Sequence, residues 1–360
     1  MENFCKIFIL KNGEIKALEL LEKLKNNDKL TIQEFEYLIK NRNDFYDDFA
    51  NEALKIRKHF YKIDVYFRAL VEISSFCKND CFYCGLRHSN KNAHRYRLSK
   101  EKILQSVEGS YQRGFRTFVL QGGEDSEITD EFLIDLIKKI KSKYSDAAVT
   151  LSLGERDFSS YEKLKNAGAD RYLLRHETND ENHYSKLHPK SMSLDHRKDC
   201  LKNLKSLHFQ TGCGMMVGSP FQTDLTLAKD LYFIQELQPE MVGIGPFIPA
   251  DNTPFENYEH GDLDLTYFLL AMIRLIDHKA LIPITTALST LDKDSIKKGL
   301  SVGGNVLMPN VSPVENRKNY SIYNDKKDFE IQISGNFEKL KEKIEALGFN
   351  PNMSIGNYGE

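Results

Sequence analysis

The chain has 360 residues, of which 41% are hydrophobic and 28% are charged, a composition typical of one large globular domain or two ordinary ones. Its net charge of −2 gives no reason to expect a nucleic-acid partner or binding to an anionic membrane. The longest apolar runs are strand-sized, below the roughly 18 residues of a membrane span, and the N-terminus lacks a signal-peptide pattern, so we expect a cytoplasmic protein.

Residues 1–65 have the periodicity of helices. Thr31 and Glu34 have the spacing of a capping box, in which each side chain satisfies an N–H group at the start of a helix. Four apolar residues earlier in the chain fall on one helical face: Ala17, Leu20, Leu21 and Leu24. We therefore expect an N-terminal helical segment that packs on the rest of the chain.

From residue 66 onward, short apolar runs alternate with charged, helix-like segments. The predicted strands are residues 66–74, 117–123, 147–154, 171–177, 211–218, 241–249, 281–287 and 305–309. Eight such strands predict an α/β fold with a parallel sheet, and a span of about 250 residues is typical of a closed (β/α)8 barrel of the TIM type. We expect this barrel over residues 66–310 and a C-terminal extension with one helix over residues 311–360, within one structural domain. An open, doubly wound sheet is the alternative, although no glycine-rich dinucleotide turn follows the first strand.

Three cysteines, Cys77, Cys81 and Cys84, directly follow the first predicted strand. They therefore lie on a loop at the C-terminal mouth of the barrel, where barrel enzymes place their chemistry. Three interpretations compete. A structural zinc site would use His88 as its fourth ligand, and a chance group of thiols would have no function. An iron–sulfur cluster held by three thiolates would leave one iron open to an outside ligand.

The spacing Cys-x3-Cys-x2-Cys, with the aromatic Tyr83 just before the third cysteine, resembles the radical S-adenosylmethionine superfamily. The resemblance implies one [4Fe-4S] cluster on these cysteines, whose open iron is chelated by the amino and carboxylate groups of S-adenosyl-L-methionine. It also implies an enzyme in which an electron from the reduced cluster enters the sulfonium and a 5′-deoxyadenosyl radical results.

Seven motifs, taken in chain order, are similar to the HydE family of [FeFe]-hydrogenase maturases: FCKNDCFYCGLRHSNKNAHRYRLS, VLQGGED, TLSLGE, GADRYLLRHET, MVGIGPFIPADNTP, IPITTA and NVLMPNVSP. They imply a small organometallic substrate, an iron–cysteine complex with carbon monoxide and cyanide that the partner maturase HydG makes. The implied product feeds H-cluster assembly on the scaffold HydF, and reduced ferredoxin or flavodoxin is the implied electron donor of an oxygen-sensitive enzyme. Residues 214–360 contain no cysteine, so we do not expect the second cluster that some family members carry.

Other functions stay open at this point. A lysine mutase like methylornithine synthase would need a pocket for the ammonium and carboxylate groups of lysine. Biotin synthase needs further cysteines on its strands, which the second and third predicted strands lack. An iron–sulfur electron carrier or metal scaffold would have no use for an open iron. The isolated Cys5, Cys200 and Cys213 are interpreted as packing residues.

The resemblance also assigns roles to residues near the ends of the predicted strands. The main chain around Tyr83 is expected near the adenine, and Glu177 near the ribose hydroxyl groups. The glycine-rich turn that receives the methionine amino group consists of Gly122, Gly123 and Glu124. Arg197 is the expected partner of the methionine carboxylate. Arg175 projects to the same side of a strand as Glu177 and is expected near the sulfonium or the substrate.

Three further pairs of residues are candidates for the barrel cavity. Met216 and Ile244 are candidates for contact with the nucleoside. Thr285 and Thr286 are expected at the end of the seventh strand, with hydroxyl donors for an anionic ligand. Tyr320 and Tyr323 follow the last strand and are candidates for closing the cavity. Packing within the barrel is the alternative for the residues on the strands, and a surface ion pair is the alternative for Arg197.

Overall fold

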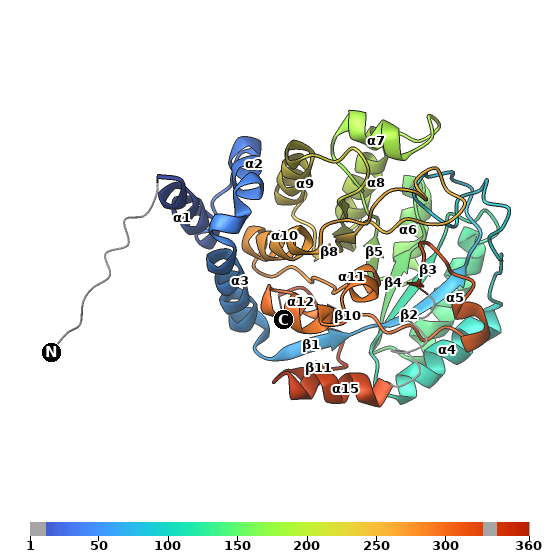
Figure 1. Ribbon diagram of the computed structural model, residues 1–360. Helices are drawn as coiled ribbons and strands as arrows, with labels where there is room; N and C mark the ends of the chain where they lie inside the picture. Colours follow the sequence, from blue (N-terminus) through green and yellow to red (C-terminus); the bar gives the residue numbers. More distant parts are fainter. Residues whose placement is uncertain (1–11, 327–336, 360) are drawn as a thin grey trace.

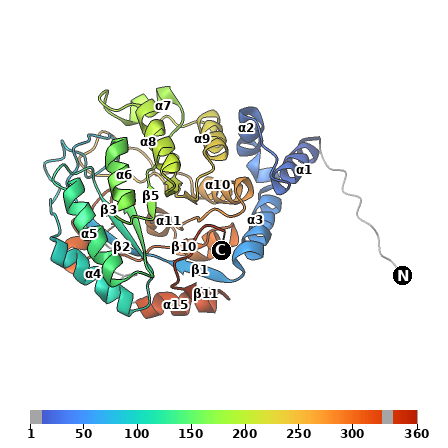
Figure 2. The same ribbon diagram turned by 180° about the vertical axis from the view of Figure 1, so that it is seen from behind.

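A ring of parallel strands lies at the centre of the molecule and helices surround it, as the opposite views in Figure 1 and Figure 2 show. The computed structural model describes residues 12–326 and 337–359. The strands are β1 (Asp64–Phe67), β2 (Ala69–Ser74), β3 (Thr117–Gly122), β4 (Ala148–Ser152), β5 (Arg171–Leu173), β6 (Gln210–Cys213), β7 (Met216–Val217), β8 (Met241–Val242), β9 (Gly245–Pro246), β10 (Val306–Leu307) and β11 (Asn350–Asn352).

Strand pairing closes the ring. Six strands pair in parallel in the order β2-β3-β4-β5-β6-β8. Single bridges continue the ring from β8 to Leu281 and from Pro283 to β10. β10 pairs with β1, and Leu70 of β2 bridges Asn310 just after β10. The predicted (β/α)8-type barrel is therefore confirmed.

The seventh predicted strand, residues 281–287, is wrong beyond its first residues. Leu281 and Pro283 make isolated bridges, but proline has no N–H group for a continuous ladder. Thr285 is the N-cap of α11 (Thr286–Leu291), and Thr286 is the first residue of that helix. Both threonines therefore lie at the start of a helix and not at the end of a strand.

Helices alternate with the strands and cover their outer faces. Besides α11, the described helices are α1 (Asn12–Lys25), α2 (Ile32–Lys40), η1 (Arg42–Asp44), α3 (Tyr46–Tyr61), α4 (Lys100–Gln112), α5 (Asp130–Lys143), α6 (Phe158–Asn166), α7 (Glu181–Leu187), α8 (Leu194–Ser206), α9 (Asp224–Leu237), α10 (Leu263–Ile276), α12 (Ser295–Ser301), α13 (Val314–Arg317) and α15 (Phe337–Ala346). Ser99, Thr129 and Asp157 cap α4, α5 and α6 by accepting from N–H groups of the first turn. Within the described ranges, the helices are all too short or too polar to cross a membrane.

The N-terminal helices pack on the barrel through α9 and α10. Thr31 and Glu34 make both hydrogen bonds of the predicted capping box at the start of α2, which is confirmed. The apolar face of α1 is buried in the main hydrophobic core, as its members Ala17, Leu20, Leu21 and Leu24 show. This face gives the segment its packing surface.

Alternation along β2 separates the hydrophobic core from the barrel interior. Val71 and Ile73 belong to the main core, which lies between the strands and the helices. Glu72 and Ser74 project to the opposite side of the strand. Glu72 is fully buried there and accepts a hydrogen bond from the side-chain amide of Asn310 (2.8 Å). The interior beneath the mouth is therefore polar.

The C-terminal residues cover the opposite, N-terminal end of the barrel. β11 pairs with β1, and the following backbone is held by the fully buried Arg171 of β5. The guanidinium of Arg171 donates to the side chains of Gln210 (3.0 Å) and Thr117 (3.1 Å). It also donates to the carbonyl groups of Ile355 and Gly356, both at 3.1 Å. One side chain thus joins three strands to the tail.

The substitution Arg171→Leu tests this anchor. It leaves buried carbonyl groups without donors, so we expect the free energy of unfolding to fall by about 2–4 kcal/mol. Urea denaturation followed by circular dichroism measures the change. Arg113→Leu, at an exposed arginine, is the matched control and should shift the free energy of unfolding by about 0.5 kcal/mol or less. Equal effects of the two substitutions would contradict the anchoring role.

Candidate active site

The three cysteines lie on the loop between β2 and α4, at the C-terminal end of the barrel strands. Arg95 shapes this loop by donating to the carbonyl groups of Leu86 (2.9 Å) and Arg87 (2.8 Å). Burial raises the pKa of all three thiols, to about 12 for Cys84. Neighbouring thiols add to the upward pKa shifts of Cys81 and Cys84, so the sulfur atoms lie near one another. A bound cation would favour the thiolates in these surroundings.

The cysteines do not form a site for a single metal ion. Throughout residues 12–326 and 337–359, no three His, Cys, Asp or Glu side chains converge as the ligands of one ion would. His88, the fourth ligand in the zinc interpretation, is exposed. No four-ligand zinc site is therefore formed among the described residues. In a cubane cluster each cysteine binds a different iron, which requires a wider separation of the thiols.

The glycine-rich turn after β3 packs directly against the cysteine loop. The N–H group of Gly123 donates to the carbonyl of Ser74 (3.3 Å), and the N–H group of Lys78 donates to the carbonyl of Glu124 (2.8 Å). A Cβ atom on Gly123 would lie 2.7 Å from the Cβ atom of Cys77, so only glycine fits behind this cysteine. The structure brings the turn and the cysteines together, and contact of the turn with a methionine amino group stays a prediction.

Arg175 and Glu177 follow the end of β5 and face each other. Their closest atoms, Nη2 and Oε2, are 3.2 Å apart, but the orientation does not make a hydrogen bond. The Nε and Nη2 atoms of Arg175 and the Oε2 atom of Glu177 are buried and have no hydrogen-bond partner among the described residues. Glu177 also has a φ of 65°, a left-handed conformation that is uncommon outside glycine. Buried polar atoms without partners mark a place that a polar ligand would complete.

Residues behind this pair hold its backbone. The N–H group of Glu177 donates to the carbonyl of Gly214 (3.0 Å). The N–H group of Gly214 donates to Nδ1 of His176 (3.3 Å), whose Nε2 lies 3.5 Å from a carboxylate oxygen of Asp230 on α9. A Cβ atom on Gly214 would lie 1.9 Å from the carbonyl oxygen of Gly243, so the two strands approach this closely only at glycine.

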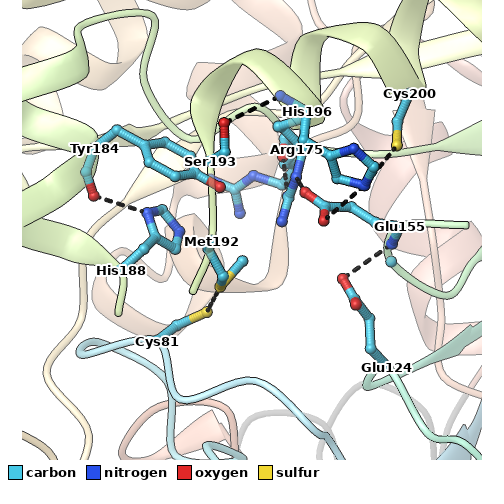
Figure 3. A network of polar contacts seen from close by, with 12 residues as sticks. Cys81, Glu124, Glu155, Arg175, Tyr184, His188, Met192, Ser193, His196 and Cys200 are labelled. Atoms are coloured by element: carbon cyan, nitrogen blue, oxygen red, sulfur yellow. Dashed lines mark hydrogen bonds and ion pairs between the residues drawn. The ribbon is translucent and has the colours of Figure 1, made fainter. Parts of the chain in front are cut away.

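Arg197 reaches the same place from α8. It is buried and donates from Nε to a carboxylate oxygen of Glu155 and from Nη1 to the carbonyl of Arg175 (2.7 Å). The N–H group of Glu155 in turn donates to the carboxylate of Glu124 (2.9 Å). Figure 3 shows the contact between Glu155 and Glu124. Arg197 is therefore not in a surface ion pair, and its contact with a methionine carboxylate stays a prediction.

Tyr83 is held by an aromatic group next to the cysteines. Nδ1 of His188 donates to the carbonyl of Tyr184 (3.1 Å), so Nε2 accepts from the hydroxyl group of Tyr83 (3.2 Å). The ring of His188 stacks on Tyr184 at 4.0 Å between centroids. Burial lowers the pKa of His188 to about 3, so its ring is neutral near pH 7. Met192 completes the group, with its sulfur 3.8 Å from the sulfur of Cys81 (Figure 3).

The remaining candidates divide between this site and other places. Met216 belongs to a small apolar group against which Phe82 and Tyr83 pack. Ile244 is instead buried in the main core, and its carbonyl accepts from the hydroxyl group of Thr285 (3.1 Å). The structure therefore places Met216, but not Ile244, in the group around Tyr83.

The two tyrosines after β10 have different surroundings. Tyr320 is buried, with its hydroxyl oxygen 3.5 Å from Nε2 of Gln121 on β3. Tyr323 lines a cavity of about 370 Å³ together with Gly85 of the cysteine loop. Tyr320 is therefore the candidate that faces the interior.

Four residues around the site are not among the sequence-based candidates: Glu155, Tyr184, His188 and Met192. Glu155 ends the motif TLSLGE at the end of a predicted strand, and this position is a usable signal. The other three lie on α7 and in the loop after it, away from any strand end. Only the fold brings them to Tyr83.

The substitution Cys84→Ala tests the cysteine site. We expect iron bound after anaerobic reconstitution to fall well below the about four atoms per chain of a cubane cluster, because one ligand is lost. Iron and sulfide analysis, with visible absorbance, measures this. Cys200→Ala and Cys213→Ala are the controls, because both thiols are buried in the main core as predicted, whereas Cys5 lies outside the described residues. Full iron content in the Cys84 variant would contradict the assignment.

The buried, neutral His188 predicts a pH dependence of stability. Its pKa in the folded state, about 3, lies below the ordinary value of about 6.5 in the unfolded chain, so only the unfolded state takes up the proton between these values. Stability therefore falls as the pH is lowered through this window. Between pH 6.5 and 5 we expect wild type to lose about 1.5 kcal/mol more than His188→Phe.

Urea denaturation at a series of pH values measures this difference. His59→Gln, at an exposed histidine, is the control and should follow the wild-type curve. A His188→Phe curve parallel to that of wild type would show that the buried imidazole is not the cause.

Comparisons with known proteins agree with this geometry. The sequence profile of the Radical SAM superfamily matches residues 71–234. The chain is 40% identical over 338 residues to the [FeFe] hydrogenase maturase subunit HydE of Thermotoga maritima. The aligned region covers 94% of this chain and 96% of that protein. It is 27% identical over 305 residues to 3-methylornithine synthase of Methanosarcina acetivorans, with 83% of each chain covered.

Two solved structures share the fold. The structure of methylornithine synthase (PylB) has a TM-score of 0.80 at 23% identity and covers 92% of this chain and 97% of that one. The structure of HydG, a maturase of the [FeFe]-hydrogenase, has a TM-score of 0.80 at 21% identity and covers 95% of this chain and 77% of that one. These identities show the fold alone, whereas the near full-length identity to HydE shows the family. The chain belongs to the HydE family within the radical S-adenosylmethionine superfamily and is a radical S-adenosylmethionine enzyme.

Proposed function

We propose that this enzyme acts in [FeFe]-hydrogenase H-cluster assembly, on a small iron–cysteine complex that carries carbon monoxide and cyanide. The observation that carries the proposal is the 40% identity to a HydE maturase subunit over 94% of the chain. In this proposal HydG supplies the substrate and HydF receives the product through transient contacts. Reduced ferredoxin or flavodoxin is the electron donor.

The residues of the site suit a [4Fe-4S] cluster and S-adenosylmethionine. Three thiols on one loop suit three irons of a cubane and leave the fourth iron open. Arg175 and Glu177 present buried polar atoms that have no hydrogen-bond partner within the described part of the chain. Gly123 lets the glycine-rich turn approach Cys77 closely. When bound, the reduced cluster and S-adenosylmethionine supply a one-electron cleavage that yields methionine and a 5′-deoxyadenosyl radical.

The protein's own groups bind and orient these ligands in the proposal. Glu177 accepts from the ribose hydroxyl groups, because an ionised carboxylate is an acceptor with two oxygens. Arg197 supplies the planar fork that suits a carboxylate. The neutral His188 accepts from Tyr83 and so fixes the tyrosine whose main chain lies along the adenine. Arg175 faces the reacting end of the ligand from the strand that carries Glu177.

A lysine mutase is the second candidate, because 3-methylornithine synthase is a relative and a methylornithine synthase shares the fold. Such a mutase needs an interior carboxylate for the ammonium group of its substrate. Glu72 in the barrel interior is already paired with the ammonium group of Lys326 at 2.7 Å. In this structure Glu72 is therefore not available to such an ammonium group.

The experiment uses the cluster-loaded enzyme with S-adenosylmethionine and a strong reductant, without oxygen. Cleavage of S-adenosylmethionine is measured alone, with a synthetic iron–cysteine dicarbonyl cyanide complex, and with lysine. We expect stimulation by the iron complex and retention of the adenosyl carbon in a product. Stimulation by lysine with a rearranged product would establish the mutase, and absence of stimulation by either compound would contradict both candidates.

The substitution Glu177→Gln tests the ribose contact. A carboxylate that accepts hydrogen bonds contributes more than a neutral amide, so we expect the Kd of S-adenosylmethionine to rise roughly tenfold to a hundredfold. Anaerobic titration calorimetry of the cluster-loaded protein measures it. Glu181→Gln, at an exposed position on α7, is the control and should leave the Kd unchanged. An unchanged Kd for the Glu177 variant would remove this residue from the site.

A further inference from the structure

Residues 311–326, here named the mouth segment, cross the C-terminal end of the barrel. The N–H group of Val311 donates to the carbonyl of Leu70 on β2 (2.8 Å). Further along, the carbonyl of Ile322 accepts from the N–H group of Gly85, the residue after Cys84 (2.9 Å). Figure 1 shows this part of the chain in red-orange, at the same end of the barrel as the loop after β2. The mouth segment therefore lies across the end of the barrel at which the candidate site is built.

Lys326 of the mouth segment makes a buried ion pair inside the barrel. Nζ of Lys326 lies 2.7 Å from Oε1 of Glu72, and the two side chains are 3% and 0% exposed. Oε2 of Glu72 accepts from the side-chain amide of Asn310 (2.8 Å). Within residues 12–326 and 337–359, many Lys and Arg side chains pair with a carboxylate. Only in the pair of Lys326 and Glu72 are both side chains almost fully buried.

The pair lies close to the cysteine loop. Nζ of Lys326 is 5.1 Å from the centroid of the Tyr320 ring. Burial, the charge of Glu72 and, more weakly, Cys84 raise the pKa of Tyr320, so this ring lies near both the ion pair and the third cysteine. Lys326 and Tyr320 are thus part of the wall of the barrel beneath the candidate site.

Stability alone does not explain a buried ion pair at this place. Burial removes water from both charges, and the free-energy cost of this desolvation can equal or exceed the gain from their attraction. An apolar pair of similar size is therefore often equally stable. The mouth segment also has an exposed contact, in which the amide of Asn324 donates to the carboxylate of Asp251 (2.7 Å), and a buried one, in which the hydroxyl group of Ser312 accepts from the N–H group of Glu72 (2.8 Å). The ion pair attaches Lys326 of the segment to the barrel interior.

We propose that Lys326 is a positioning residue that holds the mouth segment closed over the barrel through its ion pair with Glu72. A charged pair suits a contact that must open, because both partners regain water when the segment lifts. Substrate enters while the pair is open, and the radical reaction takes place while the pair is formed and solvent is excluded. The order of substrate entry and radical reaction rests on the proposed function, whereas the closure of the mouth segment does not.

Hydrogen–deuterium exchange tests the closure on the full-length, cluster-loaded protein without substrate. The decisive variant is the double substitution Glu72→Gln with Lys326→Met, because it removes the ion pair without leaving an unpaired buried charge. We expect peptides from residues 311–326 to exchange at least about tenfold faster in this variant, while peptides from β3 and β4 stay protected.

Two further variants separate the role of Lys326 from general effects. Lys326→Arg keeps the charge and should restore wild-type exchange. Lys318→Met removes an exposed lysine from the same segment and should also behave as wild type. Unchanged exchange in the double variant would overturn the proposal. Loss of protection in β3 and β4 would also overturn it, because the pair would then support the whole barrel.

Turnover provides a second readout. In the double variant we expect at least about a tenfold loss of substrate-stimulated cleavage of S-adenosylmethionine, with recovery in Lys326→Arg, because an open mouth admits solvent. If the iron complex fails to stimulate even the wild type, the proposed function is wrong, but the exchange result still decides whether Lys326 closes the barrel. If the exchange is unchanged while wild type responds to the complex, only the closure is wrong.

Discussion

Arg95 holds the loop that carries the three cysteines, and the candidate site depends on the shape of this loop. The loop has no helix or strand of its own between β2 and α4, so its carbonyl groups need other donors. The guanidinium of Arg95 donates to four of them, those of Ser75, Leu86, Arg87 and Asn90.

With the loop fixed, the other parts of the site have a surface against which to pack. Gly123 fits behind Cys77 only because it has no side chain, and the turn after β3 is thereby joined to the loop. Tyr83 is oriented by His188, and Met192 contacts Cys81 from the loop after α7. Segments that are far apart in the sequence thus meet at one end of the barrel.

Charged groups around the site differ in how completely they are paired. Arg197 has both the Glu155 carboxylate and a backbone carbonyl as partners, and Lys326 pairs with Glu72. Arg175 and Glu177 are less completely paired, because buried polar atoms on both have no hydrogen-bond partner among the described residues, and the same holds for Oε2 of Glu124. Burial of charge is costly unless it is paired, so the incomplete pair is where a ligand would contribute most to the stability of the folded protein.

The barrel could be predicted because the alternation of apolar runs with amphipathic helices is a local pattern repeated along the chain. The same pattern places Arg175 and Glu177 at a strand end. It fails at the seventh strand, where IPITTA has the β-branched residues of a strand, but Pro283 interrupts the ladder and Thr285 caps a helix. The roles of His188 and Lys326 could not be predicted, because packing between distant segments brings these side chains to the site. A local sequence pattern does not indicate such contacts.

The central claim is that Cys77, Cys81 and Cys84 hold a cluster with one iron open to S-adenosylmethionine. Electron–nuclear double resonance of the reduced, cluster-loaded enzyme tests it most directly, with S-adenosylmethionine labelled with nitrogen-15 at its amino group and oxygen-17 at its carboxylate. The account predicts hyperfine coupling of the cluster to both labels. A cluster that shows no coupling to either label, with bound S-adenosylmethionine confirmed in the same sample, would contradict it.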